Sequence, residues 1–166
     1  MMAPEAAPMH SGGVLAAGGA ALAAIVGGTV LVAGRHPIRG AVVDSRLAAA
    51  HPGAVFFALP GARTDGRLHV RAAVEAGAAA VIAEAPDETQ LQRVPGLASA
   101  WSDAAAAATA AGASLIAVRD PLVALAAAAT SWRRRLPLEV VGITGSVGKT
   151  TTKQFVAAAL GGEEAR

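Results

Sequence analysis

Short hydrophobic runs alternate along the chain with longer segments that carry a helical pattern. Runs rich in β-branched and aromatic residues predict strands, and a glycine after an apolar periodic segment predicts the end of a helix. An order in which strands and helices alternate is typical of an α/β fold. The predicted strands are 40–45, 54–59, 79–83 and 114–118, and the predicted helices are 67–76, ended by Gly77, and 121–135, opened by Asp120 as N-cap and Pro121.

The stretch 11–34 carries no charge and is long enough to cross a bilayer, which takes about 20 apolar residues. Its many glycines and alanines insert weakly into membranes, and neither a basic cluster nor an aromatic belt flanks it. A signal peptide is disfavoured because no Lys or Arg precedes the apolar part. Locally the pattern predicts a helix over 14–26, a stop at 27–28 and a strand over 29–32. A membrane-anchored protein without enzymatic activity stays open as an alternative.

The chain changes character twice after residue 85. Residues 86–113 are rich in Ala, Ser and Asp and lose the strand pattern, so they predict an inserted segment that is helical or flexible. Three arginines, 133–135, lie in the last turn of a predicted helix, where cations favour the negative end of the dipole. Pro137 then breaks the pattern and indicates a domain boundary. The predicted organisation is a flexible tail (1–12), an α/β domain (13–136) and the start of a second domain (137–166).

Composition narrows the classes of function. With 166 residues the chain has room for one domain, or for a small domain and the start of another. A formal net charge of +2 is too small for a nucleic-acid footprint, so we expect no nucleic-acid partner. The absence of cysteine excludes disulfides and thiol catalysis and suits a reducing cytosol. The four histidines (His10, His36, His51 and His69) lie far apart without the spacing of metal ligands, which predicts no zinc site.

A glycine-rich loop with the sequence TGSVGKT, 144–150, stands between a predicted strand (138–143) and a predicted helix (151–160). Glycines at 145 and 148 allow backbone conformations that residues with a Cβ avoid. The N–H groups at a helix start have no helical partner and lie at the positive end of the dipole, so they bind phosphate oxygens. In such a loop Lys149 would lie against the β and γ phosphates and the Thr150 hydroxyl would ligate Mg²⁺.

The loop is shorter than a strict Walker motif, because Ile143 stands where that motif has its first glycine. A purely structural glycine turn that caps a helix is the plain alternative. The order Gly-x-x-Gly-Lys-Thr-Thr directly after a hydrophobic strand favours nucleotide phosphate binding. A different class of P-loop protein, such as a kinase or a partition-type ATPase, also stays open.

The loop GITGSVGKTTTK, 142–153, closely resembles the ATP loop of the Mur ligases, the ATP-dependent amide-forming enzymes of peptidoglycan assembly. Upstream, 42–84 resembles the amino-terminal domain of the MurE and MurF branches, which holds the UDP end of the UDP-MurNAc-peptide. Ser146, Lys153 and the approach 118–135 are similar to the MurF branch, which adds D-Ala-D-Ala to UDP-MurNAc-tripeptide. TDGRLHV and AVIAEAP are also similar to MurE, so that branch stays open.

The resemblance implies a small amino-terminal domain that binds UDP-MurNAc-peptide, followed by the first strand, loop and helix of a P-loop ATPase domain. It implies ATP and Mg²⁺ as cofactors and a reaction through an acyl phosphate. Implied ATP contacts are Thr144, Gly145, Ser146, Val147, Gly148, Lys149, Thr150 and Thr151, with Lys149 catalytic and Thr150 on the metal. Implied UDP contacts are Ser45, Arg46, Ala62, Arg63, Thr64, Asp65 and Gly66.

The parts that such a ligase needs after its ATP loop do not follow in the sequence. No acidic strand for Mg²⁺ and no domain for the amine substrate come after the loop. The chain therefore resembles an amino-terminal fragment, and we expect it to form no amide by itself. The resemblance also implies a cytoplasmic enzyme that is a monomer at full length and takes UDP-MurNAc-peptide and D-Ala-D-Ala as substrates.

Overall fold

A computed structural model of the chain describes residues 15–61, 64–137 and 140–160. The chain divides into two compact units, Met1–Arg135 and Leu136–Arg166. Pro137, which indicates a domain boundary in the sequence, lies two residues after this division. The predicted tail, 1–12, lies outside the described residues.

A five-stranded sheet in the order β1-β5-β4-β3-β2 forms the centre of the first unit. Neighbouring strands from β2 to β5 are parallel, and β1 pairs with β5 in the antiparallel direction. The alternation of strands and helices that the sequence predicts is therefore confirmed as a mixed α/β fold. The strands are β1 (Thr29–Val32), β2 (Gly40–Val42), β3 (Ala54–Phe57), β4 (Ala80–Glu84) and β5 (Ser114–Val118).

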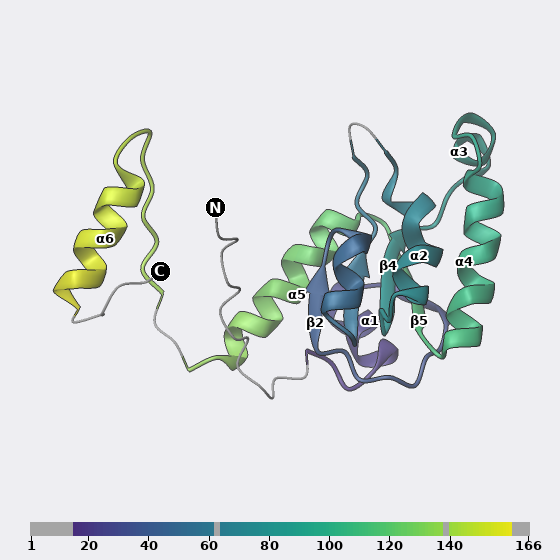
Figure 1. Cartoon of the computed structure of the whole chain (residues 1–166), viewed down its shortest axis with the longest axis horizontal. Helices are drawn as coiled ribbons and strands as arrows, with labels where there is room; N and C mark the ends of the chain where they lie inside the picture. Colours follow the sequence, from purple (N-terminus) through teal and green to yellow (C-terminus); the bar gives the residue numbers. More distant parts are fainter. Residues whose placement is uncertain (1–14, 62–63, 138–139, 161–166) are drawn as a thin grey trace. The chain divides into compact units, whose positions relative to one another are not determined.

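Helices cover both faces of this sheet, and Figure 1 shows α4 on one side and α5 on the other. Parallel strands need crossover connections, and here these connections are helical. The helices of the first unit are α1 (Gly19–Val26), η1 (Ser45–Ala50), η2 (Gly66–His69), α2 (Val70–Glu75), α3 (Glu88–Arg93), α4 (Leu97–Ala111) and α5 (Pro121–Arg135).

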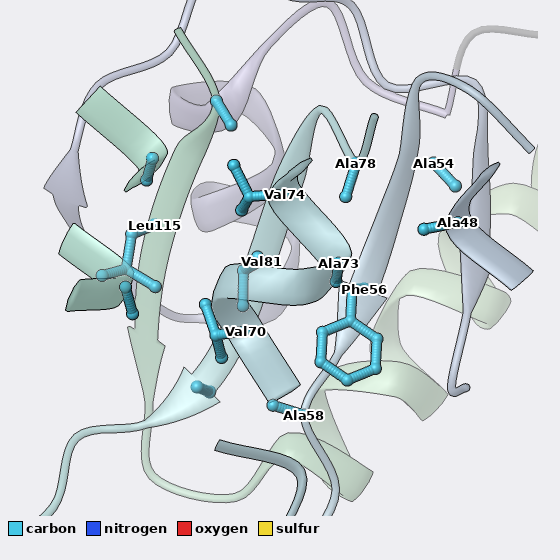
Figure 2. Close-up of a cluster of buried hydrophobic side chains, with 14 of the residues drawn as sticks. Ala48, Ala54, Phe56, Ala58, Val70, Ala73, Val74, Ala78, Val81 and Leu115 are labelled. Atoms are coloured by element: carbon cyan, nitrogen blue, oxygen red, sulfur yellow. The ribbon is translucent and has the colours of Figure 1, made fainter. Parts of the chain in front are cut away.

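The two faces of the sheet form two cores. On one face Phe56 packs with Val81 and Leu115 against α2 and α4 (Figure 2). Phe57, the next residue of β3, points to the other face and packs with residues of α1 and α5. Side chains alternate along a strand, so a strand covered on both faces is apolar throughout, and each fully buried large side chain stabilises the fold by roughly 1.5–3 kcal/mol.

The segment 86–113, expected as a helical or flexible insertion, forms α3 and α4 and links β4 to β5. Leu97, Ala104 and Ala108 of α4 are buried, and Ala104 and Ala108 belong to the core formed with the sheet and α2. Gly112 ends α4 in the left-handed conformation, with φ 66°. The alanine-rich composition therefore allows close packing of a crossover helix.

The described part of the apolar stretch, 15–34, contains helix α1 and strand β1. The helix begins at Gly19, later than the predicted start at 14, because Leu15 and Ala16 bond to the backbone of Ile38 instead. Gly27 ends α1 with φ 66°, and β1 follows from Thr29, as the sequence predicts. At 8 residues α1 extends about 12 Å, well short of a bilayer. Within the described residues no helix is both long and apolar enough to cross a membrane.

The second unit contains one described helix, α6 (Lys149–Ala159), preceded by the glycine-rich loop. The strand predicted over 138–143 is not formed at 140–143, and 138–139 lie outside the described residues. The physical reason is that a strand needs a neighbour for its backbone groups, and none of the described residues pairs with 140–143. Val140 and Val141 are accordingly 66% and 64% exposed.

Candidate functional site

The carboxyl ends of β2, β3 and β4 lie at one edge of the sheet, since these strands are parallel. Ligands of open α/β sheets bind outside this edge, in the connections that leave the strands. We call the described parts of these connections, 43–46, 58–61, 64–66 and 85–87, the carboxyl edge. The described residues that the sequence assigns to the UDP end, Ser45, Arg46 and 64–66, all lie there.

The connection after β2 is organised by an ion pair between Asp44 and Arg46. Oδ2 of Asp44 accepts from Nη2 of Arg46 at 2.6 Å, and Oδ1 accepts from the backbone N–H of Arg46 at 3.0 Å. These hydrogen bonds from the Arg46 side chain and backbone lower the pKa of Asp44 to about 2. The pair lies in solvent, with 86% of the Arg46 side chain exposed. Ser45 stands between them as the first residue of η1.

The connection after β3 repeats this geometry with Asp65 and Arg67. Nη2 of Arg67 donates to Oδ2 of Asp65 at 2.6 Å, and the backbone N–H of Arg67 donates to Oδ1 at 2.9 Å. Hydrogen bonds from the Arg67 side chain are the main cause that lowers the pKa of Asp65. In contrast to the first pair, only 8% of the Arg67 side chain and 15% of the Asp65 side chain are exposed. The sequence interpretation included Asp65 but missed Arg67.

Backbone bonds hold the described parts of the β3–α2 turn, Leu59–Gly61 and Thr64–Gly66, against one another. The N–H of Gly61 donates to the Thr64 carbonyl at 3.1 Å, and the N–H of Gly66 donates to the Leu59 carbonyl at 3.1 Å. A Cβ at Gly66 would lie 2.6 Å from the Leu59 oxygen, so this position requires glycine. Ala62 and Arg63, also assigned to the UDP end by the sequence, lie outside the described residues.

His69 lies near both ion pairs and was also missed by the sequence interpretation, which treated it as a scattered histidine. Its Nε2 and the hydroxyl Oγ1 of Thr64 form a hydrogen bond of 2.9 Å. Its charge contributes, as the smallest cause, to the lowered pKa of both Asp44 and Asp65. No spacing in the sequence signals this role, because the contact depends on η2 bringing His69 back toward Thr64.

The glycine-rich loop of the second unit turns directly into α6. Gly145 and Gly148 have φ of 151° and 78°, conformations that favour glycine. The first helical backbone bond runs from the N–H of Thr152 to the carbonyl of Gly148 at 2.8 Å. The amides of the three preceding residues therefore face no acceptor inside the helix, which leaves them available to an anion.

Side chains of the loop offer an ammonium group that can bind phosphate and hydroxyl groups that can ligate Mg²⁺. The ammonium of Lys149 folds back over the loop and donates to the carbonyl of Gly145. The hydroxyls of Thr150 and Thr151 have no hydrogen bond to any described residue, whereas Thr130 bonds the carbonyl four residues before it. The other predicted ATP contacts, Thr144, Ser146 and Val147, are exposed. The chemistry of these groups fits a phosphate chain with Mg²⁺.

A cavity of about 550 Å³ lies between α1 and α5 in the first unit and contains none of the predicted site residues. Among the described residues no group of three or more Asp, Glu or His side chains could hold a metal ion. The cavity is lined by Ile25, Ala127, Thr130, Ser131, Arg134 and Arg135.

Comparison with known proteins identifies relatives of the chain. Residues 37–133 match the family model described as Mur ligase family, catalytic domain, and this range lies within the first unit. A UDP-N-acetylmuramoyl-tripeptide–D-alanyl-D-alanine ligase of Mycobacterium tuberculosis (strain ATCC 25618 / H37Rv) is 41% identical over 147 residues, covering 85% of this chain and 28% of that protein.

Two further relatives show the range of similarity. The ligase of Bacillus subtilis with the same name is 35% identical over 126 residues, 75% of this chain and 22% of its own length. A UDP-N-acetylmuramoyl-L-alanyl-D-glutamate–2,6-diaminopimelate ligase of Pseudomonas aeruginosa is 38% identical over 125 residues, 74% of this chain and 22% of its own length. The chain thus spans less than a third of the length of these relatives.

Proposed function

Because this chain belongs to the Mur ligase family, we propose that it contributes the UDP-substrate site and the ATP loop of an ATP-dependent ligase that joins D-alanyl-D-alanine to UDP-MurNAc-tripeptide. The relative with 41% identity is named for that reaction. Such ligases belong to peptidoglycan synthesis, and a chain without cysteine suits the cytoplasm.

The glycine-rich loop is the ATP side of this proposal. The amides from Gly145 to Thr151 hold the triphosphate, Lys149 neutralises its charge, and the Thr150 hydroxyl takes a place on Mg²⁺. ATP would transfer its γ-phosphoryl group to the substrate carboxylate, with ADP as the leaving group, and the amine would then attack the carbonyl carbon of the acyl phosphate so that inorganic phosphate leaves. Since little covalent chemistry falls to the protein, the residues of the loop act by positioning and by charge neutralisation. Lys149 has to exchange its bond to the Gly145 carbonyl for the phosphates.

The carboxyl edge of the sheet is the UDP side. Among the described residues, Arg46 at this edge and Arg67 next to it have different roles, because Arg67 is buried in its ion pair whereas 86% of the Arg46 side chain is exposed. An exposed ion pair contributes little stability, so Arg46 can leave Asp44 for a diphosphate at small cost. The hydroxyl of Ser45 has no partner among the described residues, and it lies beside Arg46 at the start of η1. Residues 64–66 of the β3–α2 turn complete the contacts to the uridine end.

The conformation of the loop is the observation that carries the proposal. Positive φ at Gly145 and Gly148, with a helix that begins at Lys149, aligns unpaired amides with a lysine in the manner that phosphate binding needs. The test is calorimetric titration of the chain with Mg²⁺-ATP, comparing Lys149→Ala with Lys153→Ala. Both variants remove one positive charge from α6, so the second controls for net charge.

We expect Lys149→Ala to weaken ATP binding about tenfold or more, the value of a lost hydrogen bond to a charged group, and Lys153→Ala to change it far less. If both variants weakened Mg²⁺-ATP binding equally, Lys149 would act only through its positive charge and not through a specific contact to the phosphates. Failure of the unmodified chain to bind Mg²⁺-ATP would contradict the proposed ATP site. The 166 residues alone are not expected to form an amide.

A second candidate is a ligase that adds the third amino acid of the peptide to UDP-MurNAc-L-alanyl-D-glutamate. The observation in its favour is the 38% identity to the diaminopimelate ligase of Pseudomonas aeruginosa. Titration with UDP-MurNAc-tripeptide and with UDP-MurNAc-dipeptide separates the two candidates. Tighter binding of the tripeptide supports the D-alanyl-D-alanine ligase, and tighter binding of the dipeptide supports the second candidate.

A further inference from the structure

The buried guanidinium of Arg67 joins the β3–α2 turn to helix α3, which is distant in sequence. Through Nε and Nη2 it holds Asp65 of the β3–α2 turn. Through Nη1 it donates to the side-chain oxygen Oε1 of Gln90, on α3, at 2.9 Å. Arg67 and Gln90 are 23 positions apart in the sequence, so their hydrogen bond is a tertiary contact.

Gln90 also fixes the start of α3. Its backbone N–H donates to Oδ1 of Asp87 at 2.7 Å, and its Oε1 accepts from the backbone N–H of Asp87 at 3.1 Å, which completes a capping box. One oxygen atom of Gln90 therefore receives both the N-cap amide of α3 and the guanidinium of Arg67. No residue of α3 is buried, so these polar contacts are the main described link between α3 and the turn.

Arg67 is a largely buried cation that lies among carboxylates. Arg67 faces Asp65, Glu84 and Asp87, whose charges favour its protonated form. Removal of the Gln90 oxygen takes the acceptor away from one N–H of this cation, and a lost hydrogen bond to a charged group costs more than a lost neutral one. Loss of the Gln90 oxygen is thus expected to loosen Arg67, and with it Asp65, the residue that caps η2.

We infer that Gln90 and Arg67 are positioning residues that hold the described parts of the β3–α2 turn, Leu59–Gly61 and Thr64–Gly66, in the shape that receives the UDP end of the substrate, so that α3 supports nucleotide binding without touching the nucleotide. The inference rests on the proposed function for the identity of the ligand. The contacts that carry it are the bonds from Arg67 to Asp65 and to Gln90, together with the shared oxygen of Gln90.

The first test measures amide hydrogen exchange in the whole chain for Gln90→Ala, Gln90→Glu and, as control, Gln92→Ala on the same helix. We expect Gln90→Ala to raise exchange at Gly61 and Gly66 about tenfold, which corresponds to one hydrogen bond to a charged group. Exchange at Ser114, whose N–H donates to the Ala79 carbonyl in the sheet, should stay unchanged. Gln90→Glu keeps an acceptor for Arg67 and should restore protection.

The second test titrates the same variants with UDP. A dissociation constant raised about tenfold in Gln90→Ala, restored in Gln90→Glu and unchanged in Gln92→Ala supports the inference. Normal UDP affinity in Gln90→Ala, with unchanged exchange at Gly61 and Gly66, overturns it. If the unmodified chain does not bind UDP, the nucleotide site of the proposed function fails, whereas the exchange experiment still decides whether Gln90 controls the turn.

Discussion

Arg67 and Asp65 form a two-pronged ion pair at the start of η2, with Nη2 2.6 Å from Oδ2 and Nε 3.0 Å from Oδ1. The same arrangement occurs between Arg46 and Asp44 at the start of η1. The two pairs follow adjacent parallel strands and differ in exposure, since the first is buried and the second lies in solvent. Comparison of the two ion pairs therefore measures, within one protein, how burial changes the contribution of an Asp-x-Arg pair to the free energy of unfolding.

Replacement of Asp65 by Asn should destabilise the first unit by about 3 kcal/mol, because it leaves the charge of Arg67 buried without its partner. Asn keeps a side-chain oxygen that can cap η2, so the change isolates the ion pair from the cap. Urea unfolding measures the difference. The control is Asp44→Asn, which removes the exposed pair and should cost clearly less. Equal losses in the two variants would show that burial does not set the value of the pair.

The contribution of Asp65 should depend on pH in a defined direction. Hydrogen bonds from Arg67 lower the pKa of Asp65 in the folded protein, below the value of about 3.9 in an unfolded chain. A lowered pKa means that the ionised form stabilises the fold, fully above pH ~4 and progressively less as the pH falls through the folded pKa. Arg67 and His69 are the cations that face this carboxylate.

The measurement is the difference in unfolding free energy between the unmodified chain and Asp65→Asn across a pH series. The difference should be largest near neutral pH and should shrink below pH ~4. A difference that grows as the pH falls would contradict the sign of this prediction.

Gly66→Ala should distort the β3–α2 turn, because the new Cβ would lie 2.6 Å from the Leu59 oxygen and 2.7 Å from the Ala58 carbonyl carbon. Both are backbone atoms that cannot rotate away, so the expected cost is about 1–3 kcal/mol, with weaker UDP binding. Gly18→Ala is the control, since a Cβ there meets nothing within 4 Å. Thermal unfolding and UDP titration of the two variants check the prediction, and tolerance of Gly66→Ala would contradict it.

Gly148→Ala tests the backbone of the glycine-rich loop. A Cβ at this position meets nothing within 4 Å, but φ is 78°, so the substitution acts through conformational strain alone. Strain of about 1–2 kcal/mol should weaken Mg²⁺-ATP binding by roughly tenfold. Gly142→Ala, in open space and without positive φ, should leave binding unchanged. Equal ATP affinity of the two variants would argue against a strained phosphate-binding backbone.

Local patterns predicted the strands of the first unit with errors at their ends: the strand expected over 40–45 stops at Val42, because Ser45 already begins η1. The strand SLIAV was placed at its observed bounds, and Asp120 does cap α5, with its Oδ1 accepting from the N–H of Leu122 at 2.8 Å. The strand at 140–143 was predicted wrongly because its apolar residues satisfy a local pattern while the described chain offers no neighbouring strand. Hydrophobic patterning thus predicts the tendency of a segment, and pairing decides its structure.

The residues of the candidate site were likewise predictable only where their role depends on the local sequence. The glycine-rich loop is readable in the sequence because its chemistry lies within a few consecutive residues, and glycine is needed wherever φ is positive. Arg67, His69 and Gln90 were not predicted, since their roles depend on contacts made after the chain has folded.

The amino-acid sequence by itself determined the α/β order, the family and the position of the glycine-rich loop, because each follows from short-range pattern and local backbone geometry. Only the tertiary structure decided which of two identical Asp-x-Arg pairs is buried and which is exposed. The physical reason is that burial depends on what packs around a residue: the bond from Arg67 to Gln90 comes from a helix 23 positions away, and Arg46 has no such neighbour among the described residues.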